Sequence, residues 1–380
     1  MIYVAGDPGG AWSSRLEGLA DGAKIAVAER NGIMGARAVS TVVVPIEQRD
    51  GDQVSAAVGT GRILRDSRTL AVLGTYSAPQ LEISAAQLNG GEISLLQYGT
   101  GMLGLTQAGR PGEPGRYQPS GRNLALRGVP SDAAIAKAVG GIAGTKGITS
   151  VLANGAFNAQ QASASRAAVA AAKSAHDAAV ADGKTGDDVP PLIPGSTRSV
   201  YNPVSDAARI AEAIHGVTGG DASDQLRKGA QILVIDPTER DPAAIARRAA
   251  RGSRGLLVVI DGADRPIAAS AVAGHDGPVY RVRRALAPTS DGVGQRVRAK
   301  ERELFGRDRG DAVVAGYRAA KRMLDLGASQ PDKTIDRLTY AEQLSGDAPS
   351  NAQLPVRDAE VTLGEVVVER LSGGRWLRAR

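Results

Sequence analysis

The chain has 380 residues, which is enough for two domains of ordinary size, each with its own hydrophobic core. Apolar residues make up 42% and charged residues 23% of the chain, a composition typical of a globular protein. The absence of cysteine excludes disulfides, thiolate metal sites and cysteine nucleophiles. The net charge of +6 does not indicate a nucleic-acid partner, because arginines alternate with acids and the longest basic run, 281–284, is short.

Strand and helix patterns alternate along the chain. The first part predicts strands at 2–5, 38–45, 69–73 and 93–97 and helices at 16–30, 53–65 and 80–89. A segment rich in Gly and Pro follows at 106–122. The alternation then restarts, with strands at 148–152, 231–235, 256–260 and 279–282, helices at 132–143, 160–181, 242–251 and 310–326, and a final β segment at 362–378. This order predicts an α/β protein with two doubly wound parallel sheets in series.

The residue types that most catalytic and metal sites need are sparse. The three histidines, at 176, 215 and 275, have no second histidine at metal-ligand spacing. No Gly-x-Ser-x-Gly motif is present, and Gly183-Lys184-Thr185 lacks the first glycine of a phosphate-binding loop. The sequence therefore predicts a protein that is not an enzyme, with no metal and no cofactor.

One motif keeps an enzymatic alternative open. Residues 99–104 read Gly-x-Gly-x-x-Gly directly after a predicted strand, as in dinucleotide-binding proteins. In those proteins the motif follows the first strand and opens a helix, whereas here the sequence continues into a Gly- and Pro-rich loop. An NAD(P)-dependent enzyme using Gly99 to Gly104 is the alternative.

Polar and aromatic residues follow several of the predicted strands. Open α/β sheets bind ligands at the carboxyl ends of their strands, so we predict a small polar ligand there. The predicted ligand-binding residues are Trp12, Tyr76, Ser77, Tyr98, Gly99, Thr100 and Gly101 in the first half, and Phe157, Asp236 and Asp261 in the second. Each also has a purely structural interpretation: Trp12 could close a core edge, and Ser77 or Asp236 could cap a helix.

Several segments resemble the type 1 periplasmic binding proteins, most closely the branched-chain amino-acid binding branch. The resemblance lies in 19–35, a helix with the turn Asn31-Gly32-Ile33-Met34-Gly35, and in 70–77, a strand leading to Ser77. It continues in 93–106, which ends Gly104-Leu105-Thr106, and in the late helix at 310–326.

The resemblance implies two lobes joined by three chain crossings, with a ligand cleft that closes by hinge motion. It places lobe 1 at 1–127 plus 285–345 and lobe 2 at 128–284 plus 346–380. Ser77 and residues 98–101 would hold a ligand carboxylate, and Phe157 with Asp236 or Asp261 the ammonium group. This chain departs from the family in the loop Gln97-Tyr98-Gly99-Thr100, which lacks the usual Ser-Pro.

The expected function is that of an extracytoplasmic solute-binding protein of an ABC importer. Such a protein binds an amino acid or a related carboxylate as a monomer, delivers it to a permease and has no nucleic-acid partner. Because residues 2–5 already read as a strand and not as a signal peptide, either the protein is cytosolic or an export signal has been removed ahead of Met1; the expected function requires the second. The ligand-sensing domain of a transcriptional regulator is a further alternative, but such regulators begin with a helix-turn-helix, whereas this chain begins with a strand.

Overall fold

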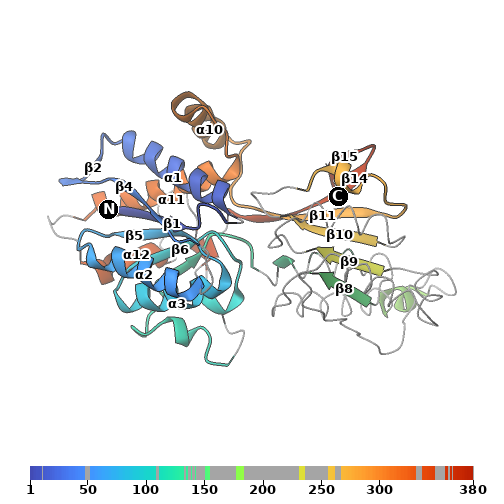
Figure 1. The fold of residues 1–380 in the computed structure, drawn as a ribbon, viewed down its shortest axis with the longest axis horizontal. Helices are drawn as coiled ribbons and strands as arrows, with labels where there is room; N and C mark the ends of the chain where they lie inside the picture. The colour runs from blue at the N-terminus through green and yellow to red at the C-terminus, as the bar shows by residue number, and fades with distance from the viewer. Residues whose placement is uncertain are drawn as a thin grey trace. The chain divides into compact units, whose positions relative to one another are not determined.

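The computed structural model describes residues 1–10, 12–47, 52–107, 111–131, 150–154, 177–183, 231–235, 256–261, 267–330, 336–346, 356–357, 360–361 and 363–379, with a few single residues between 134 and 142. The chain forms two compact units, each built from two segments of the sequence (Figure 1). Unit 1 comprises Met1–Ser131 and Ala285–Glu365, and unit 2 comprises Asp132–Arg284 and Val366–Arg380. The chain therefore passes between the units three times.

Unit 1 is built on a largely parallel sheet. Its parallel strands lie in the order β4 (Thr41–Pro45), β1 (Ile2–Gly6), β5 (Ala71–Thr75), β6 (Ser94–Gln97), β7 (Ala125–Arg127) and β13 (Glu360–Val361), with β12 (Val356–Arg357) antiparallel at the edge. The chain starts on β1, adds β4 on one side and then adds β5 to β7 on the other. This reversal defines a doubly wound sheet.

Helices cover both faces of this sheet. Alternate residues of β1 point to opposite faces, so Ile2 and Val4 lie in one core and Tyr3 and Ala5 in the other. The first core includes α1 (Ser13–Ala28) and α11 (Asp311–Ala328), with contributions from α10 (Gly292–Phe305) and α12 (Arg337–Ser345). The second includes α2 (Asp52–Arg65) and α3 (Ala78–Gly90). A strand buried on both faces needs a continuous apolar sequence, which β1 and β5 have.

Helices α1 and α11 pack closely because glycines face the partner backbone. A β-carbon built on Gly22 would lie 2.1 Å from the carbonyl oxygen of Val313. A β-carbon on Gly316 would lie 2.3 Å from the carbonyl oxygen of Leu19. The two backbones therefore touch where an alanine on either helix would keep them apart.

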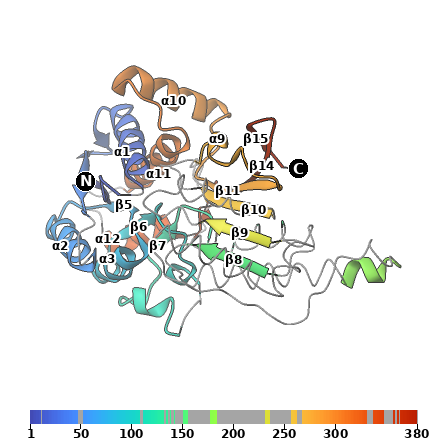
Figure 2. The same cartoon turned by 45° about the vertical axis from the view of Figure 1, so that its right-hand side comes forward.

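Unit 2 contains a second mixed sheet, with parallel strands β8 (Ser150–Asn154), β9 (Gln231–Ile235), β10 (Leu256–Asp261) and β11 (Val279–Ala285) side by side (Figure 2). The antiparallel hairpin of β14 (Glu365–Ser372) and β15 (Arg375–Arg378) extends it beyond β11. Arg281 of β11 forms an ion pair with Glu369 at 2.6 Å and lies 4.9 Å from the ring centre of Trp376. These contacts hold the hairpin against the parallel strands.

The α/β class and the doubly wound parallel sheet agree with the sequence analysis. The contacts place the third crossing after Glu365 and not near Ser345, because β13 pairs with β7 and so keeps residues 356–361 in unit 1. The first crossing follows Ser131, four residues beyond Arg127. Most of the helix residues expected at 132–143, 160–181 and 242–251 lie outside the described residues.

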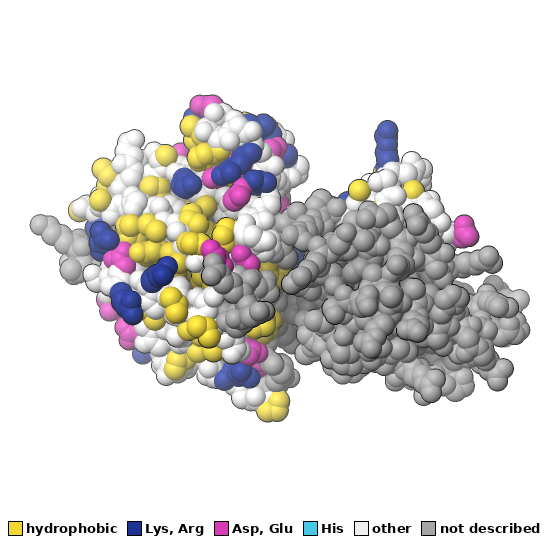
Figure 3. All heavy atoms as spheres, in the orientation of Figure 1, with side chains coloured by type: hydrophobic (Ala, Val, Ile, Leu, Met, Phe, Trp, Pro, Cys, Tyr) yellow, Lys and Arg dark blue, Asp and Glu magenta, His cyan; other side chains and the backbone are white. Residues whose placement is uncertain are grey.

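The exposed charges of unit 1 are mixed in sign. Basic and acidic side chains lie interspersed on the face shown in Figure 3. Many are paired, as Arg298 and Arg302 of α10 are with Asp308, at 2.7 and 2.6 Å. Among the described helices, none combines the length and the apolar character that a bilayer crossing needs.

The Asp308 cluster predicts an acid-sensitive contact between α10 and the turn that precedes α11. Hydrogen bonds from the guanidinium of Arg298 are the main cause that lowers the pKa of Asp308 to about 2. Since this pKa is lower in the folded state, the stabilisation is complete above the ordinary value of 3.8 and is lost as pH falls through about 2. Urea unfolding at a series of acid pH values should therefore show a shallower loss of stability for Asp308→Asn than for the wild type. Parallel pH profiles for the two proteins would contradict this assignment.

Candidate functional site

The loops that follow β1, β5 and β6 meet at one edge of the sheet of unit 1. These strands are parallel and adjacent, so their carboxyl ends share that edge. We call residues 7–10, 76–77 and 98–101 the strand-end cluster. The strand order reverses at β1, and the crevice beside such a reversal is where open α/β sheets bind ligands. The cluster contains all the predicted site residues of the first half except Trp12, which follows it at the start of α1.

The loop after β6 is bound tightly to the loop after β5. The backbone N–H of Tyr98 donates to the carbonyl of Gly74 at 2.6 Å, and that of Thr100 donates to the carbonyl of Tyr76 at 3.2 Å. The side-chain amide of the buried Gln97 donates to the carbonyl of Tyr76 at 2.8 Å. A β-carbon on Gly99 would lie 2.3 Å from that same carbonyl oxygen, so only glycine permits this approach.

Ser77 caps the amino end of α3. Its hydroxyl accepts a hydrogen bond from the backbone N–H of Gln80, and the Gln80 side chain accepts one from the backbone N–H of Ser77, which forms a capping box. Pro79 has no N–H, so the first residues of α3 leave at most the N–H of Ala78 for a ligand. The structural interpretation of Ser77 is therefore established, and its hydroxyl hydrogen stays able to donate.

The rings of Tyr76 and Tyr98 lie in the protein core. Both side chains are 0% exposed, and they belong to the two cores on opposite faces of the sheet. Burial raises the pKa of both phenols well above the usual 10. We expected these tyrosines to contact a ligand, but both rings are buried in the core, and the backbone N–H and carbonyl of each residue are already hydrogen-bonded within the protein.

Trp12, Thr100 and Arg15 also lie at this edge of unit 1. Trp12 is half-buried at the N-cap position of α1 and makes no side-chain cap. Thr100 is 8% exposed. Arg15, in the first turn of α1, is 2% exposed and donates to the carbonyls of Tyr98 and Gly99. Arg15 was not predicted as a site residue, because one arginine at the start of a helix carries no signal of burial.

The predicted residues of unit 2 are only partly described. Asp261 is the last residue of β10 and pairs with Arg283 of β11, so it lies at the carboxyl edge of its sheet. Phe157 and Asp236 lie outside the described residues. Their role as the second half of the site stays a prediction.

The Gly99–Gly104 motif does not open an α-helix. The motif leads into the short 3-10 helix η1 (Leu103–Leu105), whereas a dinucleotide site has an α-helix there. A β-carbon on Gly104 would lie 2.0 Å from a carboxylate oxygen of Glu113, and Gly99 lies against Tyr76. The described residues therefore lack the helix terminus that would bind a pyrophosphate at this motif. They also contain no group of three or more His, Asp or Glu residues that could hold a metal ion.

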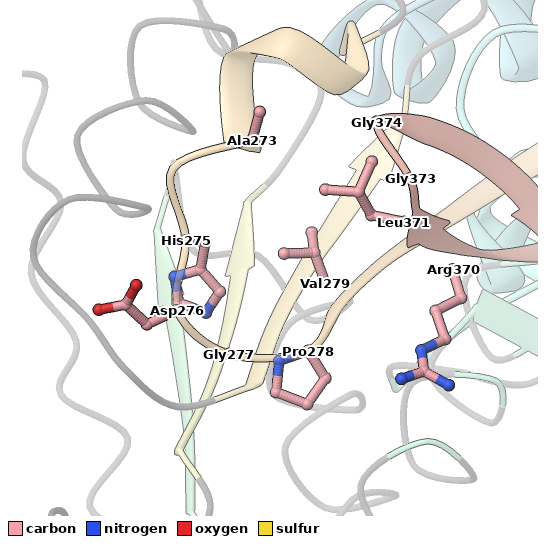
Figure 4. A pocket seen from close by; sticks show the side chains of 10 residues that line it. All are labelled: Ala273, His275, Asp276, Gly277, Pro278, Val279, Arg370, Leu371, Gly373 and Gly374. Atoms are coloured by element: carbon pink, nitrogen blue, oxygen red, sulfur yellow. The ribbon is translucent and has the colours of Figure 1, made fainter.

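A separate surface pocket of about 440 Å³ lies in unit 2. It is formed by the turn before β11, with His275 and Asp276, and by the end of β14 with the β14–β15 turn at Gly373 and Gly374 (Figure 4). This is the amino end of β11, opposite to the edge where Asp261 ends β10. None of the predicted ligand-binding residues that the structure describes lines it.

Solved structures that are similar to this chain include solute-binding proteins. A leucine-binding protein from Thermotoga maritima is 16% identical, with 100% of this chain and 97% of that chain covered and a TM-score of 0.67. An ABC transporter substrate-binding protein from Desulfitobacterium hafniense, solved with leucine, is 15% identical over 100% and 99% of the chains, with a TM-score of 0.65. A solute-binding protein of an ABC transporter from R. palustris, solved with benzoate, is 13% identical over 99% and 94%, with a TM-score of 0.64. A scan against family models and a search of curated proteins found no match. The fold is that of a type 1 periplasmic binding protein.

Proposed function

We propose that this chain is the solute-binding component of an ABC importer and that it binds a small carboxylate, such as an amino acid. The observation that carries the proposal is the strand-end cluster, where two loops are held together by backbone hydrogen bonds with Ser77 and Thr100 beside them. The full-length similarity to solute-binding proteins solved with leucine or benzoate supports it.

The cluster offers hydroxyl donors for a carboxylate. The oxygen of Ser77 accepts the N–H of Gln80, which leaves its hydrogen for a ligand oxygen. Thr100 supplies a second hydroxyl on the neighbouring loop. Because the loops are already fixed to each other, binding costs little ordering entropy, and this favours affinity for a small molecule.

The location, oligomeric state and partner of the protein follow from the same proposal. The protein would work outside the cytoplasm as a monomer, without catalysing a reaction, and would deliver its ligand to a permease. Phe157 and one of Asp236 and Asp261 would contact the amino group of an amino-acid ligand. If the ligand is a simple carboxylate such as benzoate, those acids would not be needed.

A thermal-shift screen tests the proposed function. L-leucine, L-isoleucine and benzoate are the probes, with glucose and NADH as neutral and nucleotide comparisons. A ligand that binds only the folded state at 100 times its Kd adds about 2.7 kcal/mol of stability, so Tm should rise by several degrees with at least one carboxylate. Stabilisation by NADH alone, or by no carboxylate in a broader panel, would contradict the proposal.

Ser77→Ala separates helix capping from ligand binding. Loss of an N-cap costs about 1 kcal/mol of stability, and Asp336→Ala removes a comparable cap, the one that accepts from Thr339 in α12. We expect both variants to lower Tm to a similar extent. Only Ser77→Ala should also weaken binding of the stabilising carboxylate, by about tenfold, as titration calorimetry would show. Equal ligand affinity in the two variants would remove Ser77 from the site.

A further inference from the structure

We propose that Arg15 is a positioning residue that prepares the loop after β6 to receive an anionic group. This inference rests on the proposed function, because it assigns a role within the same strand-end cluster. Arg15 is 2% exposed and lies in the first turn of α1, with its side chain directed at the loop. A buried guanidinium needs hydrogen-bond acceptors, and this one takes them from the loop backbone.

Arg15 donates to two successive carbonyls. Its Nη1 atom donates to the oxygen of Tyr98 and, at 3.2 Å, to the oxygen of Gly99. Peptide carbonyls carry a partial negative charge and would repel a ligand carboxylate placed against them. By binding both oxygens, the guanidinium turns them toward α1 and supplies positive charge at the same place.

The direction of the two carbonyls also determines the direction of the N–H groups that follow them. In a trans peptide, the N–H points opposite to the carbonyl of the preceding residue. The carbonyl of Gly99 faces Arg15, and the N–H of Thr100 accordingly donates in the other direction, to the carbonyl of Tyr76 at 3.2 Å. The N–H of Gly99 must likewise point away from Arg15. In this orientation the carbonyls of Tyr98 and Gly99 are bound by the guanidinium, and the N–H groups of Gly99 and Thr100 point away from it.

A second buried arginine anchors the far end of the same loop. Arg127 of β7 is 0% exposed and donates through Nη1 to the hydroxyl of Thr106 at 2.8 Å and to the carbonyl of Met102 at 3.4 Å. The segment from Tyr98 to Thr106 is therefore held at both ends by guanidinium groups. Of the contacts described for these two arginines, those of Arg15 lie in the strand-end cluster and those of Arg127 lie beyond it.

Two substitutions and one control test this role. Arg15→Met removes the charge at similar length, and Arg15→Lys keeps the charge but has no planar guanidinium. Arg322→Met is the matched control, because Arg322 is also buried and donates to two carbonyls, those of Leu344 and Gly346, in the region of α12. The probes are L-leucine and L-leucinamide, in which an uncharged carboxamide replaces the carboxylate while the amino group is kept, and calorimetry gives the ratio of their Kd values.

We expect Arg15→Met to lower the preference for leucine over leucinamide by about tenfold, with Arg15→Lys in between. Arg322→Met should lower Tm and leave the preference unchanged, because loss of stability alone does not discriminate a carboxylate from an amide. An unchanged preference in Arg15→Met would overturn the proposal.

Amide hydrogen exchange of the free protein gives an independent readout. Exchange in residues 98–101 should rise in Arg15→Met, whereas α3 should keep its protection. If the wild type binds none of the carboxylates, the proposed function fails, while this exchange experiment still tests whether Arg15 orders the loop. Unchanged exchange at 98–101 would overturn the positioning role whether or not leucine binds.

Discussion

Replacing Gly22 by alanine should destabilise unit 1 by about 3 kcal/mol. The added β-carbon would lie 2.1 Å from the carbonyl oxygen of Val313 and 2.5 Å from the backbone nitrogen of Tyr317. Both obstacles are backbone atoms of α11, so no flexible side chain can move aside. Helix α11 would have to separate from α1, and with it the core that contains Val313 and Tyr317 would open.

Gly61→Ala is the control for this prediction. Gly61 lies within α2, and no atom is within 4 Å of the position that its β-carbon would take. Alanine in a helix is more favourable than glycine by about 1 kcal/mol, so this variant should be more stable than the wild type. Urea unfolding in a Trp376→Phe background measures both, because Trp12 is then the only tryptophan and reports on unit 1. A Gly22→Ala protein as stable as the wild type would refute the close contact between α1 and α11.

The second large effect is expected at Tyr98. Its ring is 0% exposed and packs on Gly128, where a β-carbon would lie 2.3 Å from the ring. Truncation to alanine removes most of a buried aromatic side chain and should cost about 4 kcal/mol. Its buried hydroxyl has no hydrogen-bond partner among the described residues. Tyr98→Phe should therefore keep or slightly raise the stability of unit 1.

Ligand titration of Tyr98→Phe decides whether the Tyr98 side chain serves only the core or also contacts the ligand. If the Tyr98 side chain serves only the core, its hydroxyl does not contact the ligand, and the phenylalanine variant should bind the stabilising carboxylate as the wild type does. A loss of affinity with unchanged urea unfolding would show instead that the hydroxyl contacts the ligand. The same unfolding assay in the Trp376→Phe background provides the stability comparison.

The architecture of unit 1 could be predicted from the sequence because its strands are buried on both faces. Continuous apolar runs such as 2–5 and 69–73, separated by amphipathic helices, have few other interpretations. Helix α10 escaped prediction because it buries few side chains, among them Val297 and Glu301, and so shows little apolar periodicity. Strand β7 has only three residues, too short for an alternating pattern.

The site was harder to predict than the fold. Position after a strand correctly indicates the edge at which Ser77 and Thr100 lie, because topology alone fixes it. It does not indicate which way a side chain turns, and so Tyr76 and Tyr98 could not be distinguished from surface residues. The burial of Arg15 depends on two carbonyls more than 80 positions further along the chain, a relation that no local pattern contains.

Unit 1 is assembled from segments that a ribosome makes at very different times. One face of its sheet is covered by α11, yet about 200 residues separate the end of β7 from the end of that helix. At ~5–20 residues per second, synthesis of this stretch takes roughly 10–40 s. During that interval Val4, Leu73 and Leu96 lack the contacts that α11 makes on their face of the sheet. Apolar surface that stays uncovered for this long is prone to aggregate before α11 has been made.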